Sequence, residues 1–156
     1  MPQVSVQEVK QRLTDYRERE KYLDMEIERL DRMEDKLTSA GSPTISDMPK
    51  APSAVQDRMA ALIAVKVDLE NEISEEIKFQ QKERQYIEGV VKKLRKAEEK
   101  VVIKLRYIDG QSWNDIVDIL FAGKEDFIDK EDSYLRRVHK AHGMALENMA
   151  IIISQE

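Results

Sequence analysis

The residues best suited to chemistry in this sequence form a polar and basic group near the C-terminus. On a helical wheel, Ser133, Arg136, Arg137 and Lys140 fall on one side of a segment whose opposite side is apolar. Arginine can pair with two acceptors on a guanine edge, whereas lysine and a helix N-terminus bind phosphates. The pattern predicts a nucleic-acid recognition helix, and the alternative is an ordinary amphipathic helix with a solvated cationic face.

A second basic group precedes the first one along the chain. Residues 89–108 carry seven basic and two acidic residues, although the whole chain has a net charge of −5. With the apolar stripe of this segment turned inward, we expect Lys92, Lys96, Lys100 and Arg106 to contact a phosphate backbone. Residues 109–132 have the opposite balance, with eight acidic and two basic residues.

The sequence offers little support for catalysis or metal binding. It contains no cysteine, which excludes disulfides, zinc-thiolate sites and a cysteine nucleophile. His139 and His142 are three residues apart without a well-placed third ligand, so we expect packing or phosphate-side roles for them. Adjacent acidic residues such as Glu98 and Glu99 are interpreted as solvent-facing charge. We expect no enzyme activity, no cofactor and no metal.

The N-terminal part of the chain has the pattern of two long helices. Charged residues make up 37% of the sequence and glycine and proline are few, which favours helices over strands. Apolar residues at coiled-coil spacing predict a helix over residues 5–38, and a second stripe runs from Val55 to Leu94. Residues 39–53 are rich in proline and serine and predict a flexible linker. Residues 1–88 are therefore predicted to form a long antiparallel helical hairpin (coiled coil), with intermolecular pairing as the alternative.

The remaining residues, 89–156, predict a helix-turn-helix domain. After a possible bend at Gly89, residues 90–108 predict one helix that stops at Asp109-Gly110. Ser112 is the predicted N-cap of a short helix, with Trp113 as a core wedge, and Ser133 is the predicted N-cap of the last helix. The order of helix, tight turn, short helix, loop and helix is typical of a helix-turn-helix unit.

Two strings in this region carry a family resemblance. KLRYIDGQSWNDI at 104–116 and SYLRRVHKAH at 133–142 resemble the sigma-70 region-4-like helix-turn-helix. More closely, they resemble the ArpU/RinA-type late transcription regulators and related uncharacterised proteins of Gram-positive phages and prophages. The resemblance covers residues 98–150 and implies a regulator that binds promoter DNA of late phage genes. It also implies that the recognition helix presents five residues to the major groove: Ser133, Tyr134, Arg136, Arg137 and Lys140.

The chain departs from this family pattern at two places. Residues 121–132 are longer than the usual three- or four-residue turn, and they are acidic where DNA would lie. Gly143 falls within the last helix, where glycine costs about 1 kcal/mol relative to alanine. Close packing of another helix, or a local bend, would explain this glycine.

Taken together, these features predict an all-α regulator that binds double-stranded DNA as a homodimer in the cytoplasm of a bacterial host cell. No segment resembles a membrane span, and the hairpin is expected to serve dimerisation or to bind RNA polymerase or another protein. Three alternatives stay open. They are a phage small terminase subunit, which should form a ring of many subunits, a coiled-coil scaffold that never touches DNA, and a regulator that acts by holding another protein.

Overall fold

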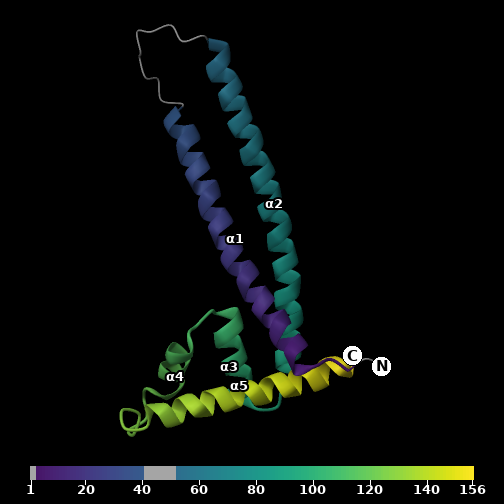
Figure 1. Cartoon of the computed structure of the whole chain (residues 1–156), viewed down its shortest axis with the longest axis vertical. Helices are drawn as coiled ribbons and strands as arrows, with labels where there is room; N and C mark the ends of the chain where they lie inside the picture. Colours follow the sequence, from purple (N-terminus) through teal and green to yellow (C-terminus); the bar gives the residue numbers. More distant parts are fainter. Residues whose placement is uncertain (1–2, 41–51) are drawn as a thin grey trace. The chain divides into compact units, whose positions relative to one another are not determined.

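A computed structural model describes residues 3–40 and 52–156 of the chain (Figure 1). The described elements are α1 (Val6–Ala40), α2 (Pro52–Lys92), α3 (Ala97–Ile103), the π-helical turn η1 (Lys104–Ile108), α4 (Trp113–Phe121) and α5 (Glu131–Ser154). The described residues contain no strand, which confirms the all-α prediction. The predicted linker lies mostly outside the described residues, since α1 continues to Ala40 and α2 begins at Pro52.

The two long helices form where the apolar stripes predict them. A capping box starts α1, because Ser5 Oγ accepts from the Glu8 backbone N–H at 3.1 Å and Glu8 Oε2 accepts from the Ser5 N–H at 2.7 Å. The helix then extends two residues beyond the predicted end at Thr38. Helix α2 continues through Gly89, so this glycine does not end the helix.

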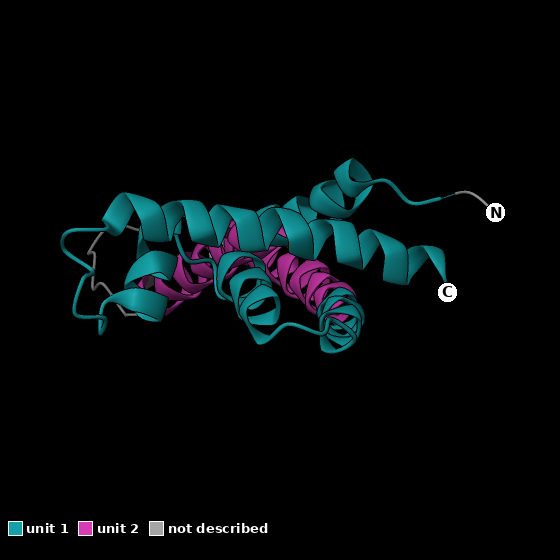
Figure 2. Cartoon of the chain, turned by 90° about the horizontal axis from the view of Figure 1, so that it is seen from below, with its two compact units in different colours: residues 1–18, 81–156 teal, residues 19–80 magenta. Residues whose placement is uncertain are grey.

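The chain divides into two compact units (Figure 2). Unit 1 contains residues 1–18 and 81–156, and unit 2 contains residues 19–80. Helices α1 and α2 each contribute residues to both units. The structure thus groups the first turns of α1 and the last turns of α2 with the C-terminal helices.

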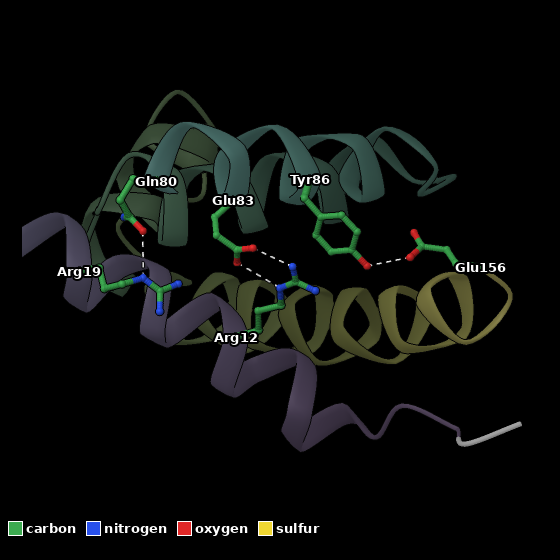
Figure 3. A network of polar contacts seen from close by, with 6 residues as sticks. All are labelled: Arg12, Arg19, Gln80, Glu83, Tyr86 and Glu156. Atoms are coloured by element: carbon green, nitrogen blue, oxygen red, sulfur yellow. Dashed lines mark hydrogen bonds and ion pairs between the residues drawn. The ribbon is translucent and has the colours of Figure 1, made fainter. Parts of the chain in front are cut away.

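The described part of unit 2 consists of residues of α1 and α2. Leu23 of α1 is buried together with Leu69 and Ile73 of α2. At one end of this apolar contact, Arg19 Nε donates a hydrogen bond to Gln80 Oε1 at 2.9 Å (Figure 3). The Gln80 Nε2 in turn donates to Glu20. Both the oxygen and the nitrogen of this buried side-chain amide are therefore hydrogen-bonded.

The larger core of unit 1 joins α1, α2, α3, η1 and α5. Leu13 and Tyr16 pack there with Val91 and Met149, all of them at most 2% exposed. Polar contacts border this core. Two of them, from Arg12 to Glu83 at 2.8 Å and from Tyr86 to Glu156 at 2.8 Å, join distant parts of the chain (Figure 3). A third joins the Val4 N–H to Ser154 Oγ at 3.0 Å.

A second core in unit 1 holds α3, α4 and α5 together. Its buried members are Val102, Ile116, Val117, Phe121 and Val138. Helix α4 lies near the N-terminal part of α5, and α3 meets the middle of α5 (Figure 1). Tyr134, Leu135 and Val138 pack into this core from the first two turns of α5, so the opposite side of these turns faces solvent.

The prediction of a single helix over residues 90–108 is wrong. Helix α2 ends at Lys92, a turn covers residues 93–96, and α3 begins at Ala97. Leu94 is only 3% exposed, and the N–H groups of Lys93 and Leu94 bond three residues back, to Val90 and Val91. These tight bonds end the helix while Leu94 enters the core. Residues 93–96 contain no glycine, proline or capping side chain from which this break in the helix could be predicted.

The predicted stop at Asp109-Gly110 is confirmed, and a distant arginine holds it. Gly110 has a φ of +72°, which glycine adopts without strain. Arg17 of α1 donates from Nη1 to the Arg106 carbonyl at 2.9 Å and from Nη2 to the Gly110 carbonyl at 2.7 Å. The guanidinium of Arg17 therefore satisfies carbonyls that the end of the helix leaves free.

Two predicted N-caps have different outcomes. Ser112 caps α4 as predicted, since its hydroxyl accepts from the Asp115 N–H at 3.1 Å. The prediction for Ser133 is wrong, because α5 begins at Glu131 after Lys130, which provides no side-chain cap. The Lys130 N–H bonds the carbonyls of Asp126 and Phe127, so the preceding loop is already coiled and the helix begins earlier.

Candidate nucleic-acid interface

The proposed recognition helix α5 has the apolar back that the wheel predicts. Val138 is fully buried, and His142, Ala145, Leu146 and Met149 are at most 8% exposed. The opposite side of the first three turns is open to solvent and carries Ser133, Arg136 and Lys140. The amphipathic division of this helix is therefore present in the fold.

Arg136 and Lys140 are uncommitted within the described part of the chain. Both side chains are exposed, and neither makes a hydrogen bond or an ion pair with a described residue. The two residues are four apart and therefore lie one above the other on the helix. A cationic pair of this kind is free to bind an external anion.

Arg137 differs from these two neighbours. Its guanidinium forms a forked contact with Glu98 of α3, at 2.9 Å and 3.3 Å, and its Cζ lies 5.1 Å from the centre of the Phe121 ring. The wheel placed Arg137 on the exposed side, and the side chain is indeed exposed. However, its charge is already paired within unit 1.

Tyr134 also turns toward the domain. Its hydroxyl donates a hydrogen bond to Asp126, and its ring stacks on Phe121 with the two ring centres 4.6 Å apart. This hydrogen bond is the main reason why the pKa of Asp126 is lowered and the pKa of Tyr134 is raised. Tyr134 thus fastens the long acidic loop to α5.

The basic residues before α4 are divided among different elements. Lys92 ends α2, Lys96 precedes α3 and Lys100 lies within α3. The side chains of these three lysines make no hydrogen bond or ion pair with a described residue. Arg106 is different, because its Nη1 donates to the Gln111 carbonyl at 3.2 Å and its Cζ lies 4.5 Å from the centre of the Trp113 ring. Arg106 therefore stabilises the turn before α4.

Two further residues of the same basic run, Lys93 and Arg95, lie at the turn between α2 and α3. Lys93 and Arg95 line a groove together with Lys96. Its other wall comes from the last turns of α5, including Asn148, and from Glu156, which follows the helix. The composition of residues 89–108 indicated a basic region. The break of the helix at 93–96, which decides their grouping, gave no sequence signal.

A buried carboxylate borders the basic region. Glu99 is 2% exposed, and Asn148 Nδ2 donates to its two oxygens at 3.1 Å and 3.3 Å. The interpretation of Glu98 and Glu99 as a solvent-facing pair is therefore wrong for Glu99. Adjacent positions on a helix point in different directions, so Glu98 reaches Arg137 while Glu99 turns toward α5.

The two histidines have separate environments. His142 is 8% exposed, and its Nε2 lies 2.7 Å from the Tyr107 hydroxyl, with which it shares a hydrogen bond. Burial is the main cause that lowers the pKa of His142 to about 4, so its ring is neutral at pH 7. His139 is exposed, with its ring centre 4.7 Å from that of Trp113. Trp113 is half-buried in the second core of unit 1, as predicted for a core wedge.

Comparison of the chain with protein-family models, curated proteins and solved structures gives no match. The resemblance to the phage regulators therefore stays a prediction. Among the described residues, no cluster of His, Cys, Asp and Glu is placed to hold a metal ion. In the same residues, no helix combines the length and the apolar character that crossing a membrane requires.

Proposed function

We propose that this chain is a phage- or prophage-type transcription regulator that binds double-stranded DNA through a helix-turn-helix formed by its C-terminal helices. In this proposal, α5 is the recognition helix and α4 supports it. The observation that carries the proposal is the exposed pair Arg136 and Lys140, which has no partner within the described residues. An apolar back and a free basic front are what a helix needs to enter the major groove.

The contacts within unit 1 narrow the set of expected DNA-binding residues. We expect Arg136 to contact a base edge or a phosphate, and Lys140 to contact a phosphate. Arg137 and Tyr134 contribute by positioning, since their polar groups are already engaged with Glu98 and Asp126. Glu131 and Asp132 make the first turn of α5 acidic, so the second and third turns should approach the DNA most closely.

Further phosphate contacts are expected from the basic residues around α3. Lys92 and Lys96 are exposed, Lys100 is half-buried, and the three have no partner within the described residues. Each neutralised phosphate releases a counterion, so binding should weaken steeply as salt rises. Arg106 is left out of this expected set because it is engaged with Gln111 and Trp113.

For α1 and α2 we propose an antiparallel hairpin that serves dimerisation or binds a protein such as RNA polymerase. The contacts between the helices support this pairing. As residue numbers rise along α1, they fall along α2: Arg12 contacts Glu83, Arg19 contacts Gln80, and Glu34 contacts Lys66.

The test is a mobility-shift titration of phage promoter fragments with the parent chain and the Arg136→Ala/Lys140→Ala variant. Loss of two direct contacts should weaken binding by about tenfold or more. The matched control is Lys10→Ala/Lys82→Ala, which removes the same charge from exposed positions on α1 and α2. Equal binding by the parent and the α5 variant would remove this helix from the interface.

A selection from random DNA extends the same test to the parent chain. A recovered sequence motif, and affinity that falls with ionic strength, would support a sequence-specific regulator. Absence of DNA binding at low salt would contradict the proposal and favour the coiled-coil scaffold that does not contact DNA.

A further inference from the structure

Unit 2 contains two grooves of opposite charge. The first, here called the cationic groove, has the apolar residues Met33, Leu37 and Leu62 in its lining. Its charged lining consists of Arg29, Arg32 and Lys36, with no carboxylate. Arg32 and Lys36 form no ion pair with a described residue, and Arg29 is 56% exposed beside Glu26 at 3.7 Å.

The second groove, here called the acidic groove, lies between earlier residues of α1 and later residues of α2. Its apolar lining comes from Tyr22, Leu23 and Ile73. Its charged lining is acidic throughout and consists of Glu26, Glu72, Glu75 and Glu76. The charge of Glu26 is the largest of several causes that raise the pKa of Tyr22, as expected beside a concentration of negative charge.

Both grooves open on one face of unit 2. Tyr22, Glu26, Arg29, Met33 and Lys36 are separated by alternating steps of four and three residues. This spacing places them in one row along α1. Tyr22 and Glu26 line the acidic groove, and the other three residues line the cationic groove. At 1.5 Å per residue, the centres of the two sets on α1 are about 13 Å apart along the helix axis.

Exposed apolar side chains accompany the charged residues on this face. Tyr22 is 53% exposed, and on α2 Val65 is 47% exposed. Val65 is seven residues before Glu72 and therefore shares its side of α2. Arg29 pairs with Glu26 at 3.7 Å and Glu75 with Lys78 at 3.4 Å, whereas Arg32 and Lys36 have no partner among the described residues. Exposed apolar side chains beside charges of one sign are typical of a surface that a partner of opposite charge covers.

We propose that this face binds a second copy of the chain, in an antiparallel arrangement related by a two-fold axis between the two grooves. The axis sets the cationic groove of each copy on the acidic groove of the other, so that the same contact forms twice. A parallel arrangement would oppose like charges, which fixes the orientation. The paired helices of the two copies would then form a four-helix bundle. This inference does not depend on DNA binding.

The test uses charge reversal in the full chain. Variant A is Arg29→Glu/Arg32→Glu/Lys36→Glu, and variant B is Glu72→Lys/Glu75→Lys/Glu76→Lys. Each variant alone opposes like charges at both contacts, so the dissociation constant for self-association should rise at least about tenfold. In a mixture of A and B, every contact again joins opposite charges. The mixture should therefore form heterodimers of about twice 18.2 kDa in sedimentation equilibrium.

The matched control is Asp24→Lys/Glu28→Lys/Asp31→Lys, which changes the charge as much as variant B at exposed positions of α1 outside both grooves. This control should dimerise as the parent does. The parent should also dissociate more readily at high salt.

Three results would overturn the inference. They are a parent chain that is monomeric at every concentration, a parent that forms larger rings, and variants A and B that dimerise unchanged. Circular dichroism verifies that each variant is helical. If one of them unfolds, the chain with both sets of reversals decides the question. It regains attraction at both contacts, so a helical but monomeric chain would contradict the proposed interface.

Discussion

At the scale of single residues, the buried imidazole of His142 predicts a specific sensitivity to acid. Its pKa is lowered to about 4 in the folded chain, against an ordinary value of 6.5, mainly because burial disfavours the charged ring. Between pH 6.5 and 4 the unfolded chain therefore binds a proton that the folded chain does not. Above pH 6.5 the neutral ring of His142 causes no loss of stability. As the pH falls from 6.5 to 4.5, the free energy of unfolding decreases by about 2–3 kcal/mol.

Urea unfolding at pH 7 and pH 4.5 measures this loss. The His142→Gln variant should lose less stability between the two pH values than the parent, because its side chain does not titrate. His139→Gln is the matched substitution at the other histidine. Because the charge of His139 is only a lesser cause of the lowered pKa of His142, this variant should keep more of the parent's loss than His142→Gln does. An identical loss in parent and His142→Gln would contradict the prediction.

A second prediction at the residue scale concerns the close contact between Gly110 and Arg17. A Cβ at Gly110 would lie 2.7 Å from Arg17 Nη1, on a backbone with a φ of +72°. Gly110→Ala should therefore cost about 1–2 kcal/mol of unfolding free energy from the backbone alone, and more from displacement of Arg17. Thermal or urea unfolding measures the change. Gly123→Ala is the control, since its Cβ would meet nothing within 4 Å.

A double-mutant cycle separates the two contributions. Arg17→Met removes the hydrogen bonds to the carbonyls of Arg106 and Gly110 and should cost about 1–3 kcal/mol. In the Arg17→Met chain, Gly110→Ala should cost less than in the parent, because the collision is gone. Strictly additive effects would show that Arg17 does not constrain this turn.

At the scale of elements, Gly143 weakens α5 without a packing reason. A Cβ at this position would meet nothing within 4 Å, so the explanation by close packing of another helix is wrong. Gly143→Ala should raise the unfolding free energy by about 0.5–1 kcal/mol, because alanine restricts the unfolded chain and favours the helix. Gly89→Ala in α2 meets equally open space and should act in the same direction. A destabilised Gly143→Ala chain in urea unfolding would contradict this account.

The ends of the helices show how far local sequence rules extend. Ser112 caps α4 as predicted, because its hydroxyl and the Asp115 N–H are neighbours in the chain. At Ser133 the same rule fails, since turns in the preceding loop start α5 at Glu131. The break at residues 93–96 also escapes local rules, because it accompanies the entry of Leu94 into a core made by other helices.

At the scale of the whole molecule, the two proposals use residues from different units. Arg136 and Lys140 belong to unit 1, whereas the cationic and acidic grooves belong to unit 2. The α5 variant should therefore sediment as the parent does, and it serves as a folded control for the association experiment. The mass of the parent also separates the rival functions, because a two-fold interface closes at two copies and a small terminase subunit should form a larger ring.

The sequence by itself determined the features that depend on periodicity and neighbouring residues. These are the all-helical class, the long helices α1 and α2, the stop at Gly110 and the apolar back of α5. Only the tertiary structure decided which charges are free. A helical wheel places Arg136 and Arg137 on the same exposed side of α5, yet Arg137 is paired with Glu98, 39 positions earlier in the chain. Glu99 likewise turns to Asn148. The physical reason is that an ion pair depends on distance in space, which residue spacing gives only within one helix.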